Sequence, residues 1–349
     1  MKLDRRSMLR LAGGTAAATM AGTAGCLDTV GLGNTGTATY SSWLAAGDTD
    51  DETFYAYVDW AAFEQFDDLE PESNPEEDEI DDEAVADRDD PMLAAPLLGV
   101  VVVSFGASFT LMGTGLTDLV AVDDESAFET SVDDVLLTDE VVVLTGDVDT
   151  DEIDETLVEP PESEWDVKTE YEQTTTIDGF SVYEPTDEDG FGMGFSEDET
   201  VAVGNDALLF ANGSDDAEAI DQLRNAIGAH AGDEQRQREV NEDIEWLLTE
   251  AGSGHVAIGS YGNPDTDDDL EADEELEELD GARGFTASLT IEGPSKSTGE
   301  FAAIFDDLDE DVEATLETEV GSTAASVEYE VDGDRIVSTA TWEEDVADL

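Results

Sequence analysis

The hydrophobic positions beyond residue 135 recur at the spacings of strands and short helices. The run VVVLTGDV (141–148) predicts a strand, and DTDEIDETLV (149–158) predicts a helix with carboxylates in its first turn. Alternating segments around short polar dipeptides indicate antiparallel hairpins. Two are predicted in this part of the chain, at 170–185 around Asp178-Gly179 and at 199–212 around Asn205-Asp206.

A helix and then a second set of elements follow. Residues 214–231 place Ile220, Leu223 and Ile227 on one helical face, with Ser214 as a natural N-cap. The second set is predicted as a helix at 240–251, strands at 254–262 and 284–293, an amphipathic helix at 297–321, and strands at 323–331 and 334–342 around Asp332-Gly333. The helix at 297–321 is predicted from the register of Phe301, Phe305, Leu308, Val312, Leu316 and Val320.

These elements predict an α+β protein with two related units of antiparallel sheet packed with helices, plus an apolar helical segment. The predicted organisation is a signal peptide (1–25), a flexible tether (26–50), a strand–helix unit with an acidic loop and the apolar segment (51–134), a first α+β unit (135–235) and a second (236–345).

The apolar segment is MLAAPLLGVVVVSFGASFTLMGTGLT (92–117), which carries no charge and is long enough to span a membrane. Pro96 and four glycines disfavour an unbroken span, and both flanks are acidic, so no positive-inside signal sets an orientation. A span would also return the acidic remainder to the cytoplasm, against the export signal described below. We expect a buried helix or helical hairpin, with membrane insertion or membrane-surface contact as the alternative.

The N-terminus has the layout of an export signal. Arg5 and Arg6 precede an uncharged stretch, Leu11–Gly25, rich in alanine, glycine and threonine, and the chain's single cysteine, Cys26, follows directly. A basic region, an apolar region and small residues before a cleavage point make a secretory signal, and paired arginines indicate the Tat route for folded proteins. The alternative is a free thiol in a disordered leader.

These residues resemble haloarchaeal Tat lipoproteins. The resemblance is confined to the first 26 residues and the acidic composition, and it implies that Cys26 is lipidated, becomes the mature N-terminus and holds the protein at the extracellular face of the membrane. A lone cysteine also excludes an intramolecular disulfide.

The strongly negative net charge of the chain limits the kinds of molecule that it can bind. The chain has 92 acidic and 12 basic residues, a net charge of −80. Two carboxylates ~6 Å apart repel by roughly 0.7 kcal/mol in water, and about 1 M salt reduces this severalfold, so the composition indicates adaptation to molar salt. Disorder is the competing explanation of high charge, but 40% of the residues are hydrophobic and periodic. Nucleic acid is excluded as a partner because no basic patch exists, while weak cation association along the acidic loops is expected.

No catalytic or cofactor pattern emerges. His230 is expected as a satisfied histidine near a helix end, and His255 as an exposed strand residue. Aspartate runs at 147–151, 187–190 and 265–269 lack the glycine, the glutamate or the first ligand of a calcium loop, and GFGMGF (190–195) lacks nucleotide-loop spacing. We therefore expect no enzyme activity, no cofactor and no metal site, with a carboxylate-dependent hydrolase as the residual enzymatic alternative.

One modification signal is present, the Asn212-Gly213-Ser214 sequon, although Ser214 can instead serve only as a helix cap. Together these features predict a non-enzymatic, lipid-anchored cell-surface protein of a halophilic archaeon, a binding domain or envelope-interaction domain with a protein partner. The alternatives are a solute-binding lipoprotein of a transporter, or a membrane-complex subunit if 92–117 inserts.

Overall fold

The structure is a computed structural model. It describes residues 38–47, 52–62, 90–120, 128–160, 168–186, 199–213, 217–262, 279, 281–293, 295–306, 308 and 310–343. The predicted lipidation residue Cys26, the predicted signal peptide and most of the acidic loops lie outside these ranges.

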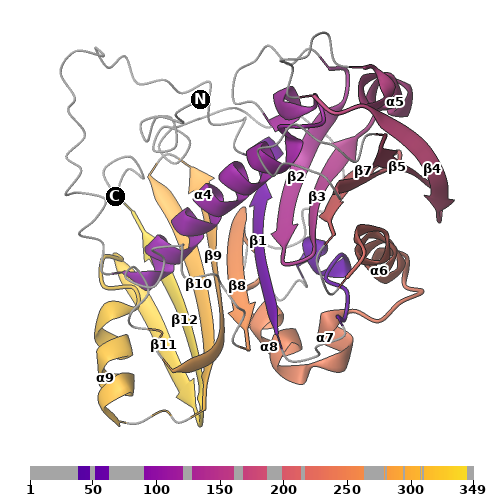
Figure 1. The fold of residues 1–349 in the computed structure, drawn as a ribbon. Helices are drawn as coiled ribbons and strands as arrows, with labels where there is room; N and C mark the ends of the chain where they lie inside the picture. Colours follow the sequence, from indigo (N-terminus) through magenta and orange to yellow (C-terminus); the bar gives the residue numbers. More distant parts are fainter. Residues whose placement is uncertain are drawn as a thin grey trace, which may run out of the picture.

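Within the described residues, twelve strands form one antiparallel sheet (Figure 1), which confirms the predicted α+β class. The strand order is β11-β12-β10-β9-β8-β1-β2-β3-β7-β6-β5-β4. The strands are β1 Thr53–Asp59, β2 Ser131–Thr138, β3 Val141–Asp147, β4 Tyr171–Ile177, β5 Phe180–Pro185, β6 Glu199–Val203, β7 Ala207–Asn212, β8 Val256–Tyr261, β9 Ala282–Gly293, β10 Lys296–Phe305, β11 Ser326–Asp332 and β12 Arg335–Trp342.

Near the middle of the sheet β1 pairs antiparallel with β8, with Tyr55 opposite Gly259 and Tyr57 opposite Ala257. From β1 the sheet continues through β2 and β3 to β7, and from β8 it continues through β9 and β10 to β12. A glycine is needed at 259 because a Cβ there would collide with the Tyr55 ring. The pair joins parts of the chain that are far apart in sequence into a single sheet.

Helices cover both faces of the sheet, so the molecule has three layers (Figure 1). One face carries α4, α5 and α9, and the other carries α6, α7, α8 and the 3₁₀ turn η1. The bounds are η1 Thr39–Ser42, α4 Pro91–Leu111, η2 Thr117–Val120, α5 Thr150–Val158, α6 Ala219–Ala231, α7 Gln237–Val240, α8 Glu242–Ala251 and α9 Glu310–Glu319.

Double coverage explains why the strands are hydrophobic without interruption. Val141, Val142, Val143 and Leu144 of β3 are all buried, with successive side chains entering opposite cores. The predicted hairpins at 178–179, 205–206 and 332–333 are present as β4–β5, β6–β7 and β11–β12. The predicted helices at 149–158 and 240–251 correspond to α5 and α8.

The predicted helix at 297–321 is wrong in its first half, which is strand β10. Phe301 and Phe305 have helical spacing, but β10 lies between β9 and β12 with both faces covered, so all five residues from 301 to 305 are buried. The helix is confined to α9.

The predicted helix at 214–231 corresponds to α6, which begins at Ala219 with Glu218 in the N-cap position. Ser214, the predicted N-cap, lies outside the described residues.

Part of the predicted tether also belongs to the fold. Tyr40 and Trp43 are only 4% and 5% exposed and pack in the core beneath α6 and α8. The Tyr40 hydroxyl donates to the Gly252 carbonyl at 3.0 Å, and Ala45 forms a β-bridge with Arg236. Two large aromatic side chains bury enough apolar surface to hold residues 38–47 against the sheet.

Candidate functional site

Helix α4 is fixed at its start by the buried carboxylate of Asp90. Asp90 caps the helix by accepting from the Met92 N–H at 3.1 Å. It also accepts from the Gly321 N–H at 2.9 Å, the Thr323 N–H at 3.1 Å and the Thr323 hydroxyl at 2.7 Å. One side chain therefore caps α4 and ties it to the turn that follows α9.

The inner face of α4 is part of the core. Met92, Val103 and Leu111 are fully buried against the sheet, and the helix contacts strands from β10 to β3. Two glycines allow the close approach: a Cβ at Gly99 would lie 3.3 Å from the Ile258 Cβ, and one at Gly106 would collide with Leu137. Small residues at these positions let a single straight helix cross the sheet.

The end of α4 is fixed as well. The Gly113 carbonyl accepts from the Thr169 N–H at 2.8 Å, and Leu116 is fully buried. The backbone then turns at Gly115, whose φ of 81° suits glycine and where a Cβ would lie 3.2 Å from the Lys168 side chain. The predicted apolar segment is thus one sheet-packed helix with a capped start and a tied end.

The outer face of α4 is apolar and exposed. Among the described residues six large hydrophobic side chains are exposed, and four of them lie on or directly after this helix. We call this set the α4 face: Val101 (42% exposed), Phe105 (63%), Phe109 (48%) and Met112 (43%). The rings of Phe105 and Phe109 stack with centroids 6.2 Å apart. Contiguous exposed apolar side chains of this kind mark interaction surfaces.

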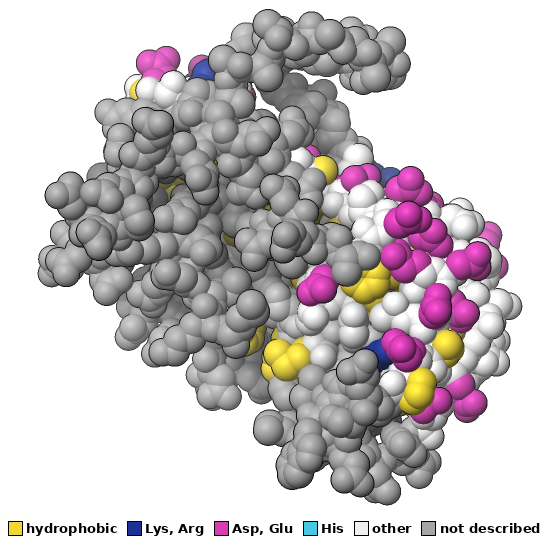
Figure 2. Space-filling model, turned by 90° about the horizontal axis from the view of Figure 1, so that it is seen from above, with side chains coloured by type: hydrophobic (Ala, Val, Ile, Leu, Met, Phe, Trp, Pro, Cys, Tyr) yellow, Lys and Arg dark blue, Asp and Glu magenta, His cyan; other side chains and the backbone are white. Residues whose placement is uncertain are grey.

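Asp and Glu side chains are numerous on the described surface in the view of Figure 2, with a few hydrophobic groups between them. Between Asp90, which is sealed inside, and exposed Asp118, the chain has no charged residue. An uncharged strip on a chain of net charge −80 is suited to contact with an apolar partner.

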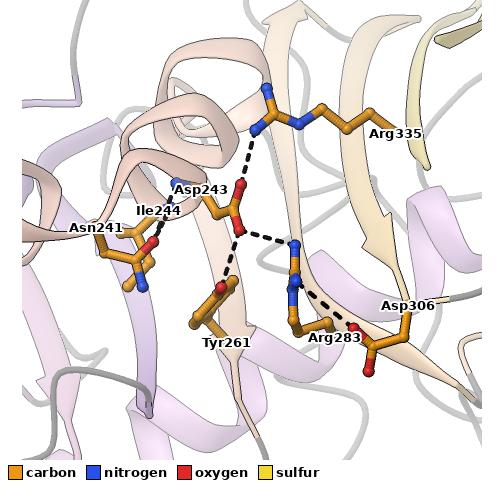
Figure 3. Close-up of polar contacts among 7 residues, drawn as sticks. All are labelled: Asn241, Asp243, Ile244, Tyr261, Arg283, Asp306 and Arg335. Carbon is orange, nitrogen blue, oxygen red and sulfur yellow. Dashed lines mark hydrogen bonds and ion pairs between the residues drawn. The ribbon is translucent and has the colours of Figure 1, made fainter. Parts of the chain in front are cut away.

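A second polar cluster lies where α8 meets the sheet (Figure 3). Asp243 accepts from Arg335 at 2.7 Å, from Arg283 at 2.8 Å and from the Tyr261 hydroxyl at 2.9 Å. Arg283 also pairs with Asp306 at 3.5 Å, and the Arg335 guanidinium lies over the Trp246 ring at 4.7 Å. Opposite charges are balanced here, so we interpret the cluster as a clamp that joins α8 to β8, β9 and β12.

The two histidines contact different elements. The Ser42 Oγ lies 3.0 Å from the His230 Nδ1, and the Trp43 ring stacks on this imidazole with centroids 3.7 Å apart. Nδ1 of His255 accepts from the Ile291 N–H at 3.2 Å, and burial lowers the pKa of His255. The expectation that His255 is exposed is therefore wrong, because it is half-buried and hydrogen-bonded at the start of β8.

The aspartates at 147, 149 and 151 lie between the end of β3 and the first turn of α5. The Asp149 carboxylate caps this helix by accepting from the Asp151 and Glu152 N–H groups at 3.1 and 3.2 Å. Glu152 accepts from the N–H groups of residues 129 and 130. These oxygens serve the backbone, and the described part of the chain holds no group of three or more His, Cys, Asp or Glu side chains placed to bind a metal ion.

Of the predicted site residues, Arg5, Arg6 and Cys26 lie outside the described ranges, as do the aspartates 187–189 and 265–269. Asn212 ends β7 opposite Glu199 and is exposed, so its side chain is accessible. The structure does not group these residues into one site. Sequence reasoning missed the α4 face because the segment is apolar on every side and gives no helical period.

Comparisons with protein-family models, curated proteins and solved structures found no match.

Proposed function

We propose that the protein is a non-enzymatic binding domain held at the extracellular face of a haloarchaeal membrane by a lipid on Cys26. The proposal combines the N-terminal signal with the acidic composition, and it assigns contact with the partner to the α4 face. Export through the Tat route delivers the domain already folded.

The observation that carries the proposal is the distribution of exposed apolar side chains. Four of the six large ones in the described residues belong to the α4 face, in a chain with 92 acidic residues. Phe105 and Phe109 are 63% and 48% exposed, so covering the remaining surface of each ring would contribute about 1–2 kcal/mol, and such a row favours a partner that covers it.

The packing of α4 disfavours the membrane-inserted alternative. Withdrawing the helix would expose the apolar residues of β1 and β8 that it covers, such as Val58 and Ile258. The antiparallel sheet also disfavours the solute-binding alternative, since two-lobed solute-binding proteins are built from parallel strand–helix alternation. A surface-binding role therefore fits the geometry best.

We also propose that the two halves of the sheet are related units. Each begins with a central strand (β1 or β8), continues with a hairpin (β2–β3 or β9–β10) and then a helix (α5 or α9), and returns with a strand beside the hairpin (β7 or β12).

Replacing the lipidation residue tests the proposed function. We expect Cys26→Ser to release the protein into the medium or leave it unprocessed, because the thiol that carries the lipid is gone. Fractionation of cells in molar salt and the mass of the mature protein provide the measurement. Unchanged membrane retention and unchanged mass would refute anchoring at Cys26. Changing Arg5 and Arg6 together to lysine should block export altogether. Comparison of the two variants therefore distinguishes loss of the export signal from loss of the lipid anchor.

A further inference from the structure

We propose that the α4 face docks onto the surface of the same membrane that carries the anchor, lying in the plane of the interface without crossing it. This inference rests on the proposed function, because the anchor at Cys26 is what keeps the α4 face near a bilayer.

The geometry of the α4 face fits a planar apolar surface. Its residues are spaced by four, four and three positions, so they project from one side of a helix about 30 Å long. Interfacial helices bury such a side by about 5–10 Å at the boundary between headgroups and acyl chains. The stacked rings of Phe105 and Phe109 stand at the centre of this side and are the natural groups to enter that boundary.

The opposite side of the helix cannot follow them into the bilayer. Val103 and Leu111 are fully buried against the sheet, and the two ends are held by Asp90 and by the Gly113–Thr169 hydrogen bond. The sheet therefore replaces the polar face that an ordinary interfacial helix turns toward water.

The length of chain before the fold supports the choice of a lipid partner. Twelve residues, 27–38, connect Cys26 to the start of the described fold, and they reach at most ~40 Å when extended. Ala38 lies on the face of the sheet opposite α4, and the three layers of the domain are about 20 Å apart from helix layer to helix layer. The extended length of this connection exceeds the separation of the two helix layers, so its length is compatible with α4 lying against the bilayer.

Anchoring makes a weak contact sufficient. Attachment to the same membrane makes docking an intramolecular step, and a short linker gives an effective concentration in the millimolar range. A second copy of the chain, or another protein, has to be met by diffusion, and a second copy also brings another 80 negative charges. The bilayer is the apolar partner that the anchor holds within reach at all times.

Charge gives this docking an unusual dependence on salt. The α4 face has no lysine or arginine to attract anionic headgroups, while the rest of the chain is repelled by them. At about 1 M salt the Debye length is near 3 Å, which removes the repulsion and leaves the apolar contact. Docking should therefore strengthen with salt, in contrast to proteins that bind membranes through basic patches.

The test uses the full chain from residue 26 with Cys26→Ser and a histidine tag in place of the lipid, held on vesicles that contain a nickel-chelating lipid. The vesicles consist of equal parts phosphatidylcholine and phosphatidylglycerol. Ser108→Cys introduces the only cysteine, and a bimane label on it reports the border of the α4 face, where Ser108 is half-buried. Acyl chains that carry a nitroxide quench the label only if it enters the bilayer.

We expect a blue shift and nitroxide quenching in molar potassium chloride, both decreasing as salt is lowered within the range in which circular dichroism shows the native fold. Phe105→Glu and Phe109→Glu should each lower the ratio of docked to undocked protein by about tenfold, because a charged group replaces a buried ring. The control is Thr249→Glu on α8, an exposed position on the opposite face that adds the same charge and should leave docking unchanged.

Three results would overturn the inference. Absence of quenching in the tethered protein shows that the α4 face does not meet lipid. A blue shift that grows with protein density but is insensitive to nitroxide lipid shows that a second copy covers the face. Cross-linking from residue 108 to another protein in native membranes, without quenching, assigns the face to a protein partner. Because the tag replaces the lipid, none of these results depends on whether Cys26 is lipidated.

Discussion

The carboxyl group of Glu199 shows how far a single residue departs from the acidic surface around it. Glu199 begins β6 and is 3% exposed, and its Oε1 accepts from the Tyr171 hydroxyl at 3.0 Å. Burial raises the pKa of Glu199 from an ordinary 4.5 to about 7, while the hydrogen bond from Tyr171 acts in the opposite direction. With a pKa of about 7 this carboxyl is partly protonated near neutrality, unlike an exposed glutamate.

Glu199 should therefore make stability depend on pH. Between its unfolded pKa of 4.5 and its folded pKa of about 7, the folded state binds more protons, so the free energy of unfolding falls as pH rises through this window. Glu199→Gln keeps an acceptor for Tyr171 and removes the ionisation. We expect it to be more stable than the parent above pH 7 by up to about 3 kcal/mol, measured by chemical unfolding in molar salt on both sides of the window.

A matched control removes the general effect of lowering the negative charge. Glu172→Gln, at an exposed position on the edge strand β4, deletes the same charge without relieving burial and should leave the pH dependence almost unchanged. If both variants show the same profile, burial of Glu199 has no effect on stability.

At the scale of elements, the position of α4 depends on one cap. Asp90→Ala removes the acceptor of the Gly321 and Thr323 N–H groups and the N-cap of the helix at once. Because these groups are buried, we expect the free energy of unfolding to fall by about 3 kcal/mol, measured by thermal and chemical unfolding. Asp118→Ala, at an exposed position just beyond the helix, should change it by less than about 0.5 kcal/mol. Equal effects would show that Asp90 does not hold the helix.

Comparison of the predicted and observed elements shows which parts of the secondary structure could be derived from the sequence. Turn dipeptides such as Asp178-Gly179 are local signals, and the hairpins they predict are present. Strand β10 was mistaken for helix because full coverage of both faces erases the alternation that identifies a strand, leaving Phe301 and Phe305 at helical spacing. Strand β2 was not predicted for a related reason, since its polar residues Asp133 and Asp134 interrupt the apolar pattern.

No local sequence pattern could have identified the α4 face. Helix α4 is apolar around its whole circumference, so only packing against the sheet decides that Val103 is buried and Phe105 exposed. Three of the four hydrogen bonds that Asp90 accepts come from residues more than two hundred positions away, and no motif marks such a contact. The burial of Tyr40 and Trp43 within the predicted tether was missed because two aromatics in a polar stretch carry no period.

At the scale of the whole molecule, net charge should set the conditions for folding. With a charge of −80, repulsion among carboxylates opposes compaction unless ions screen it. We expect the melting temperature, followed by circular dichroism, to rise steadily with potassium chloride, and the cooperative transition to be lost in dilute buffer. Full stability is of the order of 5–15 kcal/mol, and the screened repulsion summed over many pairs is comparable. A sharp melt that persists at low ionic strength would contradict adaptation to brine.

The placement of β1 between β2 and β8 has a consequence for how the protein is made. Synthesis proceeds from the N-terminus, so β1 leaves the ribosome long before Val256–Tyr261 exists to pair with it. Until then the nascent chain presents an open strand edge and an incomplete core, a state prone to mispairing with other chains. The sheet can close only late in translation, and a translocon that threads unfolded chains would never give it the opportunity before export. A pore that transports folded proteins would allow the sheet to form before export.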